Sequence, residues 1–342
     1  MSDEGFLLSP HNLPDYLVRC GLARVGDHVT ARELGGGVSN IVLAIEWAND
    51  PRRRWVAKQS LGKLRVQDDW RSDRGRVFRG AEAIQVLHPF LGDSVPEVEH
   101  VDRENFLFIM TAAPVGSTAW KDLLLAGQVS LGVAQEVGSL LARMITITST
   151  GGGLRQRFED RAVFDQLRID PYYRTAASRN RDVGPELREL IADSWAVQTA
   201  LVHGDYSPKN ILVRGDHIFL IDFEVVHWGD PAFDSGFLLN HLVLKALHRP
   251  RFCQLYVEAA RQFWKALITE LGPQAGSDFE YMTLRHLGAL LLARIDGKSP
   301  VEYIRDESTK ERVRRVASCI LLERPRRLDE ALALVLAETG EG

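Results

Sequence analysis

Cysteine is scarce in this chain, and the three that occur, Cys20, Cys253 and Cys319, are widely separated. A scattered, odd-numbered set without a C-x-x-C pair excludes a disulfide framework and a cysteine-based zinc site. Long apolar runs are also absent, since residues 287–293 form one of the longest and a membrane helix needs about 20 residues. The first residues lack a basic stretch followed by an apolar one, so we expect no secretion signal, no membrane contact and a cytoplasmic protein.

A strong charge of one sign is absent too. The net charge is −4 over 342 residues, which gives no overall attraction to nucleic acid, and we expect no nucleic-acid partner. No dense acidic cluster follows Asp234, although a cleft for a polycation would need one. The length suffices for one large domain or for two lobes.

The order of predicted elements divides the chain into two parts. A helix capped by Ser9 is expected over residues 11–20, and the first part then alternates strands with one helix. The expected strands and helix of this part are residues 41–47, 54–58, 72–87 (helix), 97–101 and 106–111. Beyond Pro114 the pattern is mainly helical. We therefore expect an α+β protein with a small β-rich amino lobe, residues 1–113, and a larger helical carboxy lobe, residues 114–342.

The carboxy part is expected to begin with a strong apolar helix over residues 131–147, broken by glycines 151–153. Two helices separated near Gly184 are expected over residues 161–194. Short strands at residues 211–214 and 218–221 follow, and amphipathic helices continue from Phe233.

Two short motifs enclose these strands. His203-Gly204-Asp205 is followed by Asn210, and the second strand leads into Asp222-Phe223-Glu224. Phosphoryl transfer needs a carboxylate that orients and deprotonates a hydroxyl, together with oxygen ligands for magnesium. Asp205 and Asn210 resemble the protein-kinase motif H-R-D-x-x-x-x-N, in which the aspartate is the base and the asparagine a magnesium ligand. Asp222 resembles the aspartate of D-F-G, which also binds magnesium.

With these motifs the chain resembles the aminoglycoside phosphotransferase, choline kinase and methylthioribose kinase superfamily, which has the protein-kinase-like fold. The resemblance implies that ATP and Mg2+ are used to phosphorylate a hydroxyl of a small molecule. It also implies that Glu224 adds a magnesium or water contact, with a structural salt bridge as the open alternative. The Asp234 carboxylate is expected to brace the catalytic loop through backbone amides.

The same resemblance assigns nucleotide contacts in the amino lobe. Lys58 matches the strand lysine that pairs with the α- and β-phosphates, and Glu82 is its expected ion-pair partner. A glycine-rich loop is expected to cover the phosphates with its backbone N–H groups. The loop residues are Gly35, Gly36, Gly37, Ser39 and Asn40.

The strand at residues 106–111 resembles the one that leads into the hinge of a kinase. Met110 is expected beside the adenine, and backbone groups of Thr111 and Ala112 at its edge.

Two departures separate this chain from protein kinases. Gly204 replaces the arginine of H-R-D, and only twelve positions separate Asp222 from Asp234, with no A-P-E sequence between them. A protein substrate is therefore not expected. The amino lobe, with Lys58-Gln59, is most similar to methylthioribose kinases, whereas the catalytic loop is closer to aminoglycoside and choline kinases.

The acceptor remains open at this point, and a methylthioribose-like pentose is one candidate. Tyr206 and Trp228 are candidates for a sugar-binding face, and Arg294 is a candidate contact to an oxygen-rich substrate. Two alternatives stay open: a phosphotransferase that confers resistance to an aminoglycoside or another antibiotic, and a non-catalytic nucleotide-binding module. A homodimer is also left open.

Overall fold

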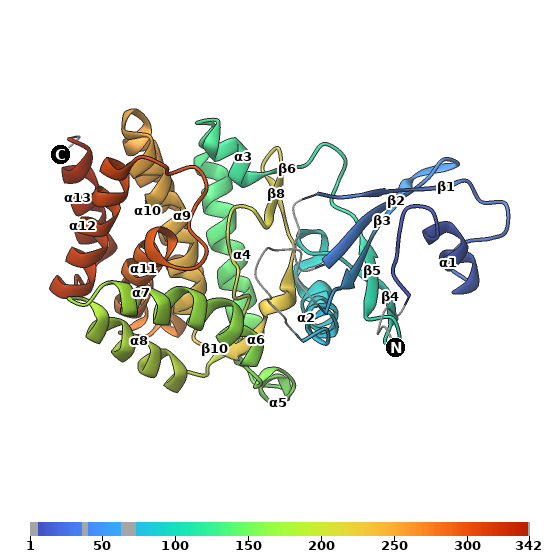
Figure 1. Ribbon diagram of the computed structural model, residues 1–342, viewed down its shortest axis with the longest axis horizontal. Helices are drawn as coiled ribbons and strands as arrows, with labels where there is room; N and C mark the ends of the chain where they lie inside the picture. The colour runs from blue at the N-terminus through green and yellow to red at the C-terminus, as the bar shows by residue number, and fades with distance from the viewer. Residues whose placement is uncertain (1–5, 36–39, 63–72, 341–342) are drawn as a thin grey trace. The chain divides into compact units, whose positions relative to one another are not determined.

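The computed structural model describes residues 6–35, 40–62 and 73–340 (Figure 1). The chain divides into two compact units, one ending at Val115 and the other beginning at Gly116. The first contains a five-stranded sheet and the second is mainly helical. This confirms the expected α+β architecture, with a β-rich amino unit and a helical carboxy unit.

In the amino unit, one antiparallel sheet has the strand order β1-β2-β3-β5-β4. Its strands are β1 Val29–Glu33, β2 Asn40–Trp47, β3 Asp50–Ser60, β4 Val98–Asp102 and β5 Leu107–Thr111, and its helices are α1 Leu13–Arg19 and α2 Arg76–Leu91. Helix α1 covers one face, where Leu13 and Leu17 pack in one buried cluster with Leu43 and Ala57. Successive residues of a strand point to opposite faces, so Lys58 points away from this cluster.

The amino-terminal segment is tied to this sheet by one glutamine. The Gln59 side chain is fully buried and accepts a hydrogen bond from the Leu8 backbone N–H at 2.8 Å. Its Nε2 donates to the carbonyl oxygens of Phe6 and Asn105, at 2.8 and 2.9 Å. All polar atoms of a buried amide are thereby used, which gives Gln59 a structural role beside Lys58.

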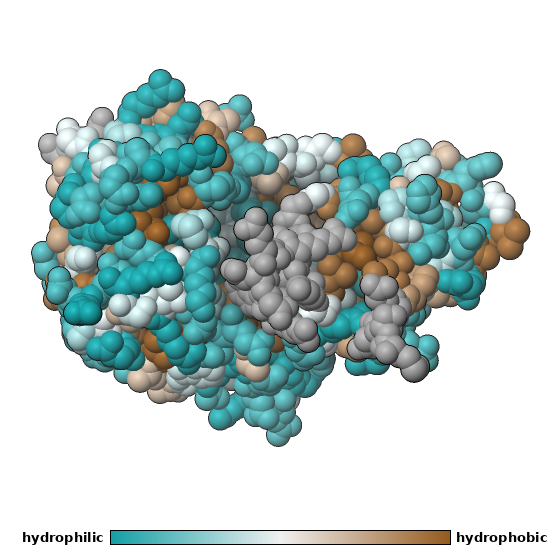
Figure 2. Space-filling model, in the orientation of Figure 1, coloured by the Kyte–Doolittle hydropathy of each residue, from teal (hydrophilic) through white to brown (hydrophobic). Residues whose placement is uncertain are grey.

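The carboxy unit combines two small sheets with a large group of helices (Figure 1). Its strands are β6 Thr118–Ala119, β7 Ala200–Val202, β8 Ile211–Arg214, β9 His217–Leu220 and β10 His227–Gly229. Its α-helices are α3 Trp120–Leu125, α4 Leu131–Ser149, α5 Leu154–Phe158, α6 Ala162–Phe164, α7 Thr175–Arg179, α8 Gly184–Ala196, α9 Ala232–His248, α10 Cys253–Leu271, α11 Phe279–Asp296, α12 Glu307–Glu323 and α13 Leu328–Thr339. The surface shown in Figure 2 is mostly hydrophilic over these helices, as expected when each buries its apolar side.

Several boundaries differ from those expected from the sequence. Helix α1 begins after Asn12. The Asn12 Oδ1 accepts the Ser9 backbone N–H, and the Asn12 backbone N–H donates to the Ser9 hydroxyl, so Ser9 forms a turn before the helix and does not cap it. Helix α2 continues past Leu87 and through Pro89 to Leu91. The segment expected to hold one helix before Gly184 contains α6, a π-helical stretch Asp165–Arg174, and α7 in direct succession. Every helix among the described residues is too short or too polar to span a membrane.

The contact between α4 and α10 depends on a glycine. A Cβ atom on Gly138 would lie 2.2 Å from the carbonyl oxygen of Phe263, so the two helices approach closely at this point. We expect Gly138→Ala to destabilise the protein by about 1–3 kcal/mol, because a backbone atom has no rotamer with which to move away. Urea denaturation measures the change.

The matched control is Gly132→Ala in the first turn of the same helix. The nearest atom to the added methyl group there is 3.7 Å away, which is ordinary contact. This variant should equal or slightly exceed the stability of the wild type. Equal stability of the two alanine variants would disprove the close packing at Gly138.

Candidate active site

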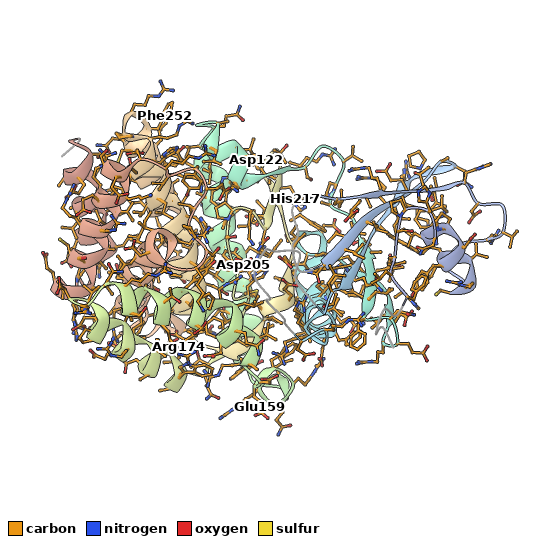
Figure 3. The ribbon with its side chains drawn as sticks, viewed as in Figure 1. Asp122, Glu159, Arg174, Asp205, His217 and Phe252 are labelled. Atoms are coloured by element: carbon orange, nitrogen blue, oxygen red, sulfur yellow. The ribbon has the colours of Figure 1, made fainter. Side chains whose placement is uncertain are left out.

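The loop between β7 and β8 brings Asp205 and Asn210 together within the carboxy unit, and Figure 3 labels Asp205 on it. The Asp205 side chain is buried, with 3% of its surface exposed. Its Oδ2 accepts hydrogen bonds from Asn210 Nδ2 and from Lys209 Nζ, both at 2.8 Å. Its Oδ1 lies 3.1 Å from a terminal nitrogen of Arg168. The candidate base is therefore in contact with three side chains, those of Asn210, Lys209 and Arg168.

The charges around Asp205 keep it ionised. Burial alone raises the pKa of this carboxyl, but Arg168 and Lys209 lower it by more, and the result is a pKa below the ordinary value. Such a group is a weak base. It is nevertheless suited to phosphoryl transfer, where orientation of the hydroxyl contributes more than base strength.

His203 connects the catalytic loop to the segment after β9. Its Nδ1 accepts the Asp205 backbone N–H at 3.1 Å, and its Nε2 lies 3.1 Å from the Ile221 carbonyl oxygen. Burial lowers the pKa of His203 to about 4, so the ring is neutral at neutral pH and carries its proton on Nε2. The Ile221 N–H donates in turn to the Asn210 carbonyl oxygen at 2.9 Å. These bonds fix the two motifs to each other.

Asp234, in the first turn of α9, braces the catalytic loop as expected. Its Oδ2 accepts the His203 N–H at 2.6 Å and its Oδ1 accepts the Gly204 N–H at 2.9 Å. Burial raises the pKa of Asp234 to about 7, and the two N–H donors oppose this shift. The carboxylate is completely buried, so the loop is anchored from inside the unit.

The structure also explains why glycine follows His203. Gly204 has a φ of +74°, a conformation that L-residues rarely adopt. A Cβ atom at this position would lie 2.8 Å from the Val225 carbonyl oxygen. An arginine, which protein kinases have at the corresponding position, would not fit this backbone.

Asn210, Asp222 and Glu224 offer oxygen ligands of the kind that Mg2+ prefers. The amide nitrogen of Asn210 is occupied by Asp205, so its oxygen is the atom suited to a hard cation. Asp222 has φ 72° and ψ 60°, a strained conformation for aspartate that often marks functional sites. The fields of Asp205, Asp222 and Glu224 all act on the buried Arg168 and raise its pKa, against the lowering by burial.

The donor set is therefore chemically suitable for magnesium, with oxygens from an amide and two carboxylates. Within the described ranges no three acidic, histidine or cysteine side chains form a cluster that could bind a metal without further ligands. A magnesium ion at this site would complete its coordination with phosphate oxygens and water. The metal roles of the three residues remain predictions.

In the amino unit, Lys58 is buried, lies on β3 and pairs with Val42 and Phe108 in the sheet. Glu82 is half-buried on α2, a helix that packs against β3, β4 and β5. Gly35 is exposed and Asn40 begins β2, whereas Gly36, Gly37 and Ser39 lie outside the described residues. The nucleotide contacts of these residues remain predictions.

The expected hinge strand is β5, and Met110 is buried on it. The Thr111 N–H already donates to Glu97 O and the Ala112 N–H to Arg54 O, each at 2.9 Å. These two N–H groups are therefore used within the sheet. A backbone contact from Thr111 or Ala112 to an adenine edge would therefore have to use a carbonyl oxygen. The expected backbone contacts are thus limited to hydrogen-bond acceptors.

Two expected substrate residues point into the protein core. The Tyr206 side chain is fully buried and its hydroxyl donates to the Val137 carbonyl oxygen at 2.7 Å, which fixes the catalytic loop to α4. Trp228 is 3% exposed and its Nε1 donates to the Gln198 carbonyl oxygen at 3.0 Å. The expectation of a sugar-binding face formed by these rings is therefore corrected.

Arg294 has partners inside the carboxy unit. Its guanidinium donates to the Tyr172 hydroxyl at 3.1 Å and to the Ser299 hydroxyl at 3.0 Å, near the end of α11. It also lines a small pocket next to the catalytic loop. Arg294 therefore both forms hydrogen bonds near the end of α11 and lines a pocket next to the catalytic loop.

Neither of the two cations that hold Asp205 was predicted from the sequence. Lys209 was detectable, because it lies inside the motif, four positions after Asp205. Arg168 lies 37 positions before the aspartate, in the π-helical stretch, and no local pattern marks it. Its Nε also donates to the Gly204 carbonyl oxygen at 2.7 Å, so it contacts both the loop backbone and the candidate base.

Residues 30–267, more than half of the chain, match the Phosphotransferase enzyme family, APH. The chain belongs to this family, and its fold and site define a member of the kinase-like class, as the motifs indicated. Among curated proteins it is similar to methylthioribose kinase 2 of Oryza sativa subsp. japonica, with 27% identity over 65% of this chain and 58% of the relative. The match to methylthioribose kinase of Escherichia coli O45:K1 is 26% identical over 71% of this chain and 65% of that relative. The chain thus spans less than two thirds of the length of these relatives.

Two solved structures have the same fold. An ethanolamine kinase of Plasmodium vivax aligns with a TM-score of 0.53 and 13% identity, over 95% of this chain and 94% of that one. An amicoumacin kinase in complex with AMP-PNP, Ca2+ and Ami aligns with a TM-score of 0.52 and 16% identity, over 87% and 90% of the two chains. At these identities the likeness supports the two-lobed kinase-like fold alone.

Replacement of the Asp234 carboxylate should loosen the catalytic loop. Asparagine keeps one acceptor oxygen but turns an NH2 group toward a backbone N–H, so we expect Asp234→Asn to cost about 1–3 kcal/mol of stability. Urea denaturation measures this loss. Asp278→Asn is the control, because Asp278 is exposed and does not cap α11 with its side chain. Similar stability of both variants would show that Asp234 does not brace the loop.

Proposed function

We propose that this chain transfers the γ-phosphoryl group of ATP to a hydroxyl of a small metabolite, with Mg2+ as the metal. The observation that carries the proposal is the buried, ionised Asp205 carboxylate held between Arg168, Lys209 and Asn210. In the proposal, residues 1–113 contribute nucleotide contacts, and residues 114–342 contribute the catalytic loop and the acceptor site. Family membership supports the same reaction class.

Asp205 orients the acceptor hydroxyl and receives its proton as the phosphoryl group is transferred. Its fixed position supplies most of its effect, because a correctly placed hydroxyl loses little entropy on the way to the transition state. Lys209 is about half exposed, with 54% of its side-chain surface accessible, and its ammonium lies 2.8 Å from Asp205 Oδ2. We propose that the Lys209 ammonium offsets the negative charge of the phosphoryl group during transfer.

Magnesium would supply charge neutralisation on the phosphate oxygens, and Asn210, Asp222 and Glu224 are the residues proposed to hold it. Lys58 pairs with the α- and β-phosphates in this proposal, and Glu82 orients the lysine. The other amino-unit contacts proposed are the loop Gly35, Gly36, Gly37, Ser39 and Asn40, and the adenine-side residues Met110, Thr111 and Ala112. The acceptor class named by the relatives, methylthioribose, is one candidate among hydroxylated metabolites.

Asp205→Asn tests the reaction directly. We expect turnover to fall by about 10²- to 10⁴-fold, since the amide cannot accept the hydroxyl proton, while the affinity for ATP is retained. Magnesium-dependent ADP release measures turnover against methylthioribose, other pentoses, hydroxy acids, choline, homoserine and several aminoglycosides. ATP binding is measured separately by calorimetry.

Asp216→Asn is the matched control, because Asp216 lies exposed in the turn between β8 and β9. This variant should turn over like the wild type. Undiminished ADP release by Asp205→Asn would contradict the proposed base. ATP binding with no turnover on any acceptor would favour a nucleotide-binding module.

A further inference from the structure

A small pocket lies entirely within the carboxy unit, next to the catalytic loop. It is lined by side chains from α3, the catalytic loop, α9, α11 and the segment before α12. Its ionisable and hydroxyl groups belong to Lys121, Lys209, His241, Lys245, Arg294, Glu302 and Tyr303. Five separate segments therefore converge on one space beside Asp205.

The charges around this pocket do not balance. Four of the lining residues are cationic and one, Glu302, is acidic. The Glu302 carboxylate is paired with Lys121, and Lys209 is paired with Asp205. Lys245 and Arg294 remain, and neither forms an ion pair with a carboxylate among residues 6–35, 40–62 and 73–340. Lys245 and Arg294 are thus the two basic groups of the pocket that lack a carboxylate partner in the described part of the chain.

Lys245 is the more unusual of the two. Its side chain is completely buried, and its ammonium donates to the His241 carbonyl oxygen at 3.2 Å and lies 5.4 Å from the centre of the Tyr303 ring. Burial, together with Lys121 and Arg294, lowers the pKa of Lys245 to about 7. A buried cation without a counter-charge destabilises the folded protein. A bound anion would remove this cost.

Two hydrogen-bond donors also point to a missing ligand. The Tyr303 hydroxyl and Arg294 Nε are buried, and neither has a hydrogen-bond partner in the described part of the chain. The space in the pocket is about 30 Å³, and a single water needs roughly 10–15 Å³ on this measure. The pocket therefore has room for a group the size of a carboxylate, with donors that match its oxygens.

The pocket adjoins the candidate base through two connections. Lys209 lines the pocket and also donates to Asp205 Oδ2 at 2.8 Å. Arg294 donates to the Tyr172 hydroxyl, and the Tyr172 ring lies 5.6 Å from the guanidinium carbon of Arg168, the other partner of Asp205. An acceptor could therefore place one group in the pocket while its hydroxyl lies at Asp205.

We propose that this pocket binds the carboxylate of the phosphate acceptor, so that the acceptor is a hydroxy acid, such as a sugar acid, with Lys245, Arg294 and Tyr303 as its carboxylate-binding residues. The inference rests on the proposed kinase function and names its substrate class. It disfavours cationic acceptors such as choline and aminoglycosides, because they would meet like charges.

The test compares acceptors that carry a carboxylate with counterparts that carry a neutral hydroxymethyl group in its place. The full chain is assayed for magnesium-dependent ADP release and for ligand-induced melting shifts, with gluconate against glucitol and glycerate against glycerol as probes. We expect at least one carboxylate to bind and react, whereas its neutral counterpart does neither. Lys245→Met should raise the KM for that carboxylate by about 10- to 100-fold and leave the KM for ATP unchanged.

Tyr303→Phe provides a variant with little risk of misfolding, because it removes one unpaired hydroxyl. It should raise the acceptor KM by about 3- to 10-fold without lowering the melting temperature. Lys265→Met, an exposed position on α10, is the control and should behave like the wild type.

The inference is wrong if no carboxylate raises the melting temperature of the wild type more than that of Lys245→Met. It is also wrong if a neutral or cationic acceptor reacts and Lys245→Met leaves its KM unchanged, although the kinase proposal then stands. A change confined to the KM for ATP would instead assign the pocket to the nucleotide. Carboxylate binding without ADP release would support the pocket and contradict the kinase proposal.

Discussion

The Asp234 carboxylate accepts two successive backbone N–H groups, from His203 and Gly204, and the geometry of the catalytic loop depends on this interaction. Two adjacent N–H groups can point at one carboxylate only if the backbone between them turns sharply, which the positive φ of Gly204 permits. His203 is fixed by the same turn, and its ring then holds both the Asp205 N–H and the Ile221 carbonyl oxygen. The buried Asp234 carboxyl group of α9, together with the His203 ring, thereby fixes the position of the catalytic loop relative to the segment after β9.

The second constraint is charge. Asp205, Asp222 and Glu224 concentrate negative charge around Arg168, which is itself buried. Like charges repel one another, and the buried guanidinium of Arg168 offsets part of that repulsion. We therefore expect a metal cation to bind here only when phosphate oxygens and water complete its coordination. It is consistent with a metal that arrives with a nucleotide.

The parts of the site that the sequence predicted are those that lie close together along the chain. Asp205 and Asn210 lie on one loop, and Asp222 follows the next hairpin, so motif spacing alone located them. Arg168 could not be found in this way, because its contact with Asp205 depends on how the π-helical stretch packs against the loop. The sequence did not predict the burial of Tyr206 and Trp228, because aromatic residues near a motif serve the core as readily as a substrate. Tyr206 bonds to α4, and Trp228 pairs with Leu201 of β7.

The same reasoning explains why the acceptor pocket was invisible in the sequence. Lys121, Lys245 and Arg294 are 124 and 49 positions apart, and only the packing of α3, α9 and α11 brings them to one space. Their effect on an acceptor is directional, because Lys245 and Arg294 lack a carboxylate partner among the described residues and would attract an anionic group into the pocket. At an effective dielectric constant of about 20, one unpaired charge about 5 Å away contributes on the order of 3 kcal/mol. A hydroxy acid would therefore be oriented with its hydroxyl toward Asp205, whereas a cation would be drawn in the opposite sense and a neutral polyol would have no preferred orientation. In this proposal, the electrostatic field around the pocket selects an acceptor by its charge, and specific contacts to the rest of the acceptor add to that selection.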